Sequence, residues 1–194
     1  LILSFFIFLI SSNVFGGETP PNWMKQAASA AVPNFEKSES AVVLHNEQHV
    51  ALDSDGKLVT TENYAVRILS REGRRKAVAL AFYLVKFSKV REMEAWMIRP
   101  DGSTGFYGKK NIIDQISDPD DVYDEGRLKI IDASGDADAG YVFGYSVVTE
   151  DKPLFYQDSF VFQDKMPTML SRYTLTLPAG WSASGVTFNH AEIK

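Results

Sequence analysis

The residue types that most often do chemistry in proteins are sparse in this sequence. It has no cysteine, which excludes a thiolate nucleophile, a cysteine-ligated zinc ion and a disulfide. Of its three histidines, His45, His49 and His190, the first two are four residues apart. On a strand they would share one face about 13 Å apart, too far for one metal ion. The sequence also lacks a nucleophile elbow, a phosphate loop and a dinucleotide fingerprint. We therefore predict no catalytic residues, no cofactor and no enzymatic activity.

Carboxylates gather in two segments, which raises the question of calcium. One is the acidic segment 118–125, and the other contains Asp136-x-Asp138. Calcium prefers carboxylate oxygens, but the regular calcium loop needs a glycine directly after its third ligand and a glutamate at position twelve. Counted from Ser134, position twelve is Tyr145, and the glycine is absent. We expect solvated acidic loops, and we expect a chelator to leave thermal unfolding unchanged.

Aromatic side chains provide the other candidate binding residues. The three tryptophans, Trp23, Trp96 and Trp181, could stack on sugar rings in an extracellular glycan-binding or peptide-binding module. The alternative for each is packing in the core, because each lies beside apolar neighbours or a turn. A row of exposed rings would favour sugar binding, whereas an apolar patch near the C-terminus would favour docking to another domain.

Composition narrows the class of partner. The 194 residues carry a net charge of −5, with 45% apolar and 23% charged residues, which is ordinary for a globular protein. A nucleic-acid-binding domain normally has a basic face. The main basic run, Arg71 to Lys76, is typical of a solvated turn. We predict no nucleic-acid partner.

The N-terminal residues are typical of an export signal. Leu1 to Ile10 is apolar except for Ser4, and Val14-Phe15-Gly16 places small or aliphatic residues at the positions that a signal peptidase reads. The run is shorter than the roughly 20 residues of a transmembrane helix. We therefore expect a signal peptide over 1–17, a periplasmic or extracellular location, and no transmembrane segment in the mature chain. Residues 18–36 read as a lead-in with a short helix between Trp23 and Ala31, stopped by Pro33.

The stretch Ala95 to Ser103 is the clearest local signal. It reads as a strand with Met93, Ala95 and Met97 on one face and Trp96 on the other. Pro100-Asp101-Gly102 follows, and Asp-Gly is a strong hairpin signal because glycine accepts the positive φ of a tight turn. We predict a hairpin with Gly102 at its tip.

Alternating or continuous apolar segments recur along the rest of the chain. Ala77 to Phe87 is apolar at nearly every position, which suits a buried strand or a helix; its β-formers favour a strand. We predict an all-β, two-sheet antiparallel sandwich of about nine or ten strands. The strands are expected at 41–52, 57–69, 77–87, 90–99, 106–108, 127–133, 141–150, 155–163, 170–177 and 181–188.

The order of these segments resembles domain of unknown function family 3857, a β-domain that precedes transglutaminase-like domains in secreted bacterial proteins. The resemblance is carried by residues 68–73, 95–103, 123–124, 140–145 and 171–181, together with Pro153, Phe155, Phe160, Phe162 and Pro167. Tyr141 departs from it, since the family usually has an acidic or polar residue after the preceding glycine.

The resemblance implies an immunoglobulin-like sandwich over 37–194, export, and a following papain-like domain with a Cys-His-Asp triad. It implies no catalytic residues within this chain. We therefore expect a non-catalytic accessory domain that packs against a transglutaminase-like domain of the same polypeptide. The alternative is a module that binds a cell-envelope glycan or peptide. For docking, Val186, Phe188 and Ile193 are the expected apolar residues where the chain leaves the domain.

Overall fold

A computed structural model describes residues 18–35, 38–118, 120 and 125–188. Within them, nine strands form a six-stranded sheet in the order β5-β4-β8-β2-β1-β9 and a three-stranded sheet in the order β3-β7-β6. We call them the large and the small sheet. The strands are β1 (Ala41–Leu52), β2 (Leu58–Ile68), β3 (Val78–Leu84), β4 (Ser88–Ile98), β5 (Thr104–Tyr107), β6 (Ile113–Ile116), β7 (Gly126–Asp132), β8 (Val142–Asp151) and β9 (Ser171–Thr176).

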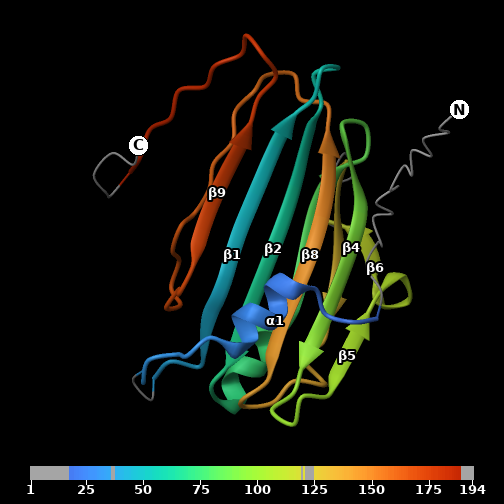
Figure 1. The fold of residues 1–194 in the computed structure, drawn as a ribbon. Coiled ribbons are helices and arrows are strands. Elements are labelled where there is room, and N and C mark those ends of the chain that lie inside the picture. The colour runs from blue at the N-terminus through green and yellow to red at the C-terminus, as the bar shows by residue number, and fades with distance from the viewer. Residues whose placement is uncertain (1–17, 36–37, 119, 121–124, 189–194) are drawn as a thin grey trace, which may run out of the picture.

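The layers are a helix, the large sheet and the small sheet. Helix α1 (Asn22–Ser29) lies across the front of the large sheet in Figure 1, and the small sheet lies behind it. Short 3-10 turns occur at η1 (Arg71–Lys76) and η2 (Lys109–Asn111). In the described part of the chain, no helix is long and apolar enough to cross a membrane. The predicted short helix after Pro21 and the two-sheet, all-β class are confirmed.

One pairing differs from the predicted antiparallel sandwich. β9 runs parallel to β1, so the large sheet is mixed, whereas the other strand pairs are antiparallel. The chain leaves β8 at one end of the sheet and crosses to the other end before β9 starts, so β9 enters in the same direction as β1 (Figure 1). The immunoglobulin-like arrangement implied by the family resemblance stays a prediction.

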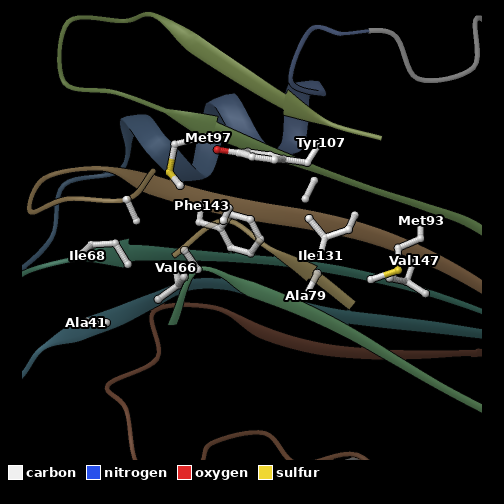
Figure 2. Packing of buried hydrophobic residues seen from close by; sticks show 14 of the residues in the cluster. Ala41, Val66, Ile68, Ala79, Met93, Met97, Tyr107, Ile131, Phe143 and Val147 are labelled. Carbon is white, nitrogen blue, oxygen red and sulfur yellow. The ribbon is translucent and has the colours of Figure 1, made fainter. Parts of the chain in front are cut away.

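The main core lies between the two sheets. Large side chains of the large sheet, Phe143, Met93 and Met97, face small ones on β3, Ala79 and Ala81, and all five are 5% exposed or less. Figure 2 shows Phe143 and Ile131 pointing into this layer. Opposing large with small residues lets the sheets approach closely without voids.

A second core lies under α1, on the outward face of the large sheet. Met24 and Ala27 of the helix are buried against Trp96, Val142 and Ala65. Gly144 makes room for this contact, because a Cβ there would lie 3.0 Å from the Met24 sulfur. The alternation predicted for β4 is thus confirmed, with Met93 and Met97 in one core and Trp96 in the other.

The predicted hairpin is confirmed. The Arg99 N–H donates to the Ser103 carbonyl at 2.9 Å, and Gly102 has a φ of 83°. Asp101 Oδ1 accepts the Ser103 N–H at 2.9 Å and closes the turn. The turn sets β5 beside β4, so that Phe106 packs on Trp96 with ring centroids 6.2 Å apart.

Two predicted strands are absent. Residues 155–163 and 181–188 have no strand in the structure. The first segment is held to β1 by side chains instead: Asn46 Nδ2 donates to the Val161 carbonyl at 3.2 Å. The place next to β1 is taken by β9, whose register pairs Asn46 with Ser171. After β9, Pro178 and Gly180 (φ 85°) turn the chain away from the sheet.

Candidate functional site: an exposed apolar sheet face

The small sheet has apolar side chains on both faces. In β3, Ala79 and Ala81 point into the core, so the residues between them, Leu80 and Phe82, point outward. The register places Ile130 opposite Leu80, and Leu128 opposite Phe82. Ile113 of β6 in turn pairs with Ile130 and joins the same face. We call the set Leu80, Phe82, Leu84, Ile113, Leu128 and Ile130 the outward apolar face.

This face is open to solvent. Its side chains on the edge strands, Leu80, Phe82, Leu84 and Ile113, are between 39% and 55% exposed, and those on the central strand β7 are partly buried by their neighbours. Single exposed apolar residues are common on protein surfaces, but a contiguous set over three paired strands is typical of an interaction site. Val85 and Phe87, in the turn after β3, are also exposed.

A polar cluster lies on the reverse side of the same strands. Asp114 accepts a hydrogen bond from the Tyr83 hydroxyl at 2.8 Å and one from Arg127 Nε at 2.9 Å. Burial opposes ionisation of Asp114, but these hydrogen bonds and the charge of Arg127 outweigh it and lower the pKa of Asp114. Lys129 lies over the Tyr83 ring at 5.7 Å. These residues are in phase with the core-facing residues Ala79 and Ala81, so the cluster is not part of the outward apolar face.

The three tryptophans do not form one row of rings. Trp96 is 2% exposed in the core under α1, and Trp23 packs against that core with its ring 5.1 Å from the His45 ring. Trp181 is 51% exposed, and its ring meets Tyr156 edge-on at 5.4 Å. Tyr156 donates to the Gly56 carbonyl, at the far end of β1 from His45. Trp181 and the partly buried Trp23 therefore lie at opposite ends of the large sheet.

The histidines have separate partners. His45 Nε2 lies 3.3 Å from Glu47 Oε2, and His49 Nε2 lies 2.8 Å from the Thr176 hydroxyl. Burial opposes ionisation of Glu47, but hydrogen bonds from His45 and Asn63 and the charge of Arg172 lower its pKa. His190 lies outside the described residues. Within those residues, no group of three or more His, Cys, Asp or Glu side chains could hold a metal ion.

The remaining predicted sites are only partly described. Val186 and Phe188 are 78% and 81% exposed, so the chain does carry uncovered apolar groups after β9. Ile193 and most of the acidic segment 118–125 lie outside the described residues. Asp136, in the second acidic turn, accepts the Tyr107 hydroxyl at 2.8 Å and has a structural role.

The outward apolar face was not predicted, although the sequence contains a signal for it. Ala77 to Phe87 is apolar on successive residues, and such a run is typical of a strand covered on both faces. Among the residues that the structure describes, only one face of β3 is covered. A sequence pattern typical of two covered faces, together with one exposed face in the structure, identifies the outward apolar face as a candidate binding surface.

The comparisons agree with the fold. Residues 54–192 match the family described as "Domain of Unknown Function with solved-structure structure (DUF3857)". The chain belongs to this family, as the sequence resemblance implies. No curated protein matches the sequence.

Among solved structures, the chain is similar to "a putative protease" from Parabacteroides distasonis ATCC 8503. The TM-score is 0.63 and the identity 12%, over 73% of this chain. At this identity the likeness concerns the fold alone. The chain spans 29% of the length of that protein.

Proposed function

We propose that this chain is a non-catalytic accessory domain of an exported protein, and that it packs against a transglutaminase-like catalytic domain of the same polypeptide. The observation that carries the proposal is the outward apolar face, because a sheet with apolar residues on both faces needs a second cover. The similar solved structure, of which this chain spans 29%, is compatible with a β-domain set within a longer protein.

The proposal assigns the contact to the small sheet. Leu80, Phe82 and Ile113 would form the centre of the interface. Interfaces between domains of one chain usually cover about 600–1,500 Å². The exposed residues after β9, such as Phe188, are a rival surface for the same role.

The test is a calorimetric titration of residues 18–194 with the catalytic domain that the proposal expects. Phe82→Ser should weaken association at least tenfold, because it removes a large ring from the centre of the face. Phe188→Ser makes the same chemical change on an exposed phenylalanine outside that face, and it should leave association unchanged.

Three results would contradict the proposal. Undetectable association at about 100 μM would argue against the accessory role, since even weak domain contacts are measurable there. Loss of association in Phe188→Ser but not in Phe82→Ser would move the contact to the segment after β9. Robust turnover of peptide or ester substrates by the repurified chain would contradict the non-catalytic part.

A further inference from the structure

A half-open cavity of about 200 Å³ lies on the inner side of the large sheet, away from the outward apolar face. Its floor comes from three adjacent strands, through Asn46 of β1, Glu62 and Tyr64 of β2, and Tyr145 of β8. The segment 159–161 forms its wall. No residue of the small sheet lines it, so the cavity lies beside the sandwich core rather than within it.

The wall of this cavity is fixed by side chains of β1 and β9. Gln48 Nε2 and the Tyr173 hydroxyl both donate to Asp158 Oδ2 at 2.9 Å, and Asn46 donates to the Val161 carbonyl. Phe160 packs on Tyr173 with ring centroids 5.6 Å apart. These contacts hold an aromatic ring and a carboxylate beside the cavity, on a segment that has no strand pairing of its own.

Three polar side chains of the cavity, Glu62, Tyr64 and Tyr145, have no hydrogen-bond or ion-pair partner among the described residues. The ion pairs and hydrogen bonds found among the described residues include none to the Glu62 carboxyl or to the hydroxyls of Tyr64 and Tyr145. Burial, followed by the negative charge of Asp158, raises the pKa of Glu62. Burial likewise raises the pKa of Tyr64 to about 12, so this hydroxyl stays protonated at neutral pH.

We propose that this cavity binds an alkylammonium group, with the Glu62 carboxylate as its counter-ion. The Tyr64 and Tyr145 hydroxyl oxygens can accept its N–H groups, and the aromatic lining suits a cation because ring faces carry partial negative charge. The volume matches a group of a few heavy atoms, since one water molecule takes about 30 Å³.

A neutral sugar fits the same cavity less well. The Tyr64 and Tyr145 rings stack on each other, with centroids 5.3 Å apart and planes at 25°, so each covers one face of the other. A sugar would also leave the Glu62 charge uncompensated. The ammonium group has two sources, a lysine side chain of a peptide or a free amine.

The test is an NMR titration of residues 18–194 with n-butylammonium and, as the uncharged control, n-butanol. We expect saturable shifts of residues around the cavity with the amine, at a Kd of about 1–10 mM, and none with the alcohol. Glu62→Gln should weaken binding about tenfold or more, because it removes the counter-ion. Glu94→Gln, on the opposite face of the large sheet, is the matched control and should bind as the parent does.

A second titration distinguishes the two sources. Tighter binding of a lysine-containing peptide than of butylammonium would identify a peptide ligand, and equal binding would identify a free amine. Equal shifts with butanol, no saturable shift with the amine, or unchanged binding by a folded Glu62→Gln variant would each overturn the proposal. These results leave the accessory role untouched, because the cavity and the outward apolar face share no residue.

Discussion

Both sheets have apolar residues on their outward faces, but within the described ranges only the large sheet has a helix packed on them. On the large sheet, the apolar part of the outward face, with Trp96 and Val142, is covered by α1, and the register places polar residues such as Glu47 and Glu94 beyond the helix. On the small sheet, the outward face carries apolar residues from all three strands, and in the described residues no helix covers it.

The difference shows which apolar surface is covered by described residues of this chain and which is not. Burial of apolar surface contributes roughly 25 cal/mol per Å², so α1 obtains its stability from the large sheet rather than from its own eight residues. The small sheet offers a similar surface without a helix on it. An exposed apolar face of this size is typical of a surface that binds a partner.

The largest loss of stability should follow from weakening the contact between α1 and the large sheet. Met24→Ala should destabilise the domain by about 2–5 kcal/mol, because it empties a fully buried site between α1 and Gly144. Chemical denaturation measures the change. Met169→Ala truncates a methionine that is 42% exposed and should cost far less; equal costs would mean that α1 does not cover the sheet.

The second largest loss of stability should come from the turn between β4 and β5. Gly102→Val should cost more than about 1 kcal/mol, because a β-branched residue is strained at a φ of 83°. Gly135→Val is the matched control, since a Cβ meets nothing within 4 Å at either glycine and Gly135 has no positive φ. Equal melting temperatures of the two variants would contradict the assignment.

Substitutions on the outward apolar face should cost less stability than substitutions under α1. Leu80→Ser should cost about 1 kcal/mol or less in the isolated chain, because this side chain is already half exposed. Binding of an apolar dye should fall at the same time. A cost comparable to that of Met24→Ala would show that the face is covered within this chain, and it would remove the basis of the accessory role.

The smallest effect concerns pH. The pKa of Glu62 is raised in the folded state, so the folded state binds a proton more tightly than the unfolded state. Its contribution to stability is present below the ordinary carboxyl pKa and is lost as pH rises through the raised value. Glu62→Gln should therefore reduce the loss of stability as pH rises above the ordinary carboxyl pKa. If the stability of the variant changed with pH as that of the parent does, Glu62 would be solvated in the folded state, which would contradict this prediction.

Several features of the domain follow from the sequence alone. Alternation of side chains in β2, β4 and β8 assigns each residue to a face, because successive residues of a strand point to opposite sides. Asp101-Gly102 predicts its own turn, since the required φ is a property of the residue. The lack of cysteine limits the chemistry available to the chain, whatever its fold.

Other features depend on the tertiary structure. Alternation does not say which strands become neighbours, so the parallel pairing of β9 with β1 and the irregular course of 155–163 were not predictable. It also does not say which face of β3 meets the core, nor that Glu62, Tyr145 and Phe160 line one cavity. These arrangements rest on contacts between residues far apart in the chain, and the free energy of such contacts depends on the whole packing rather than on any local pattern.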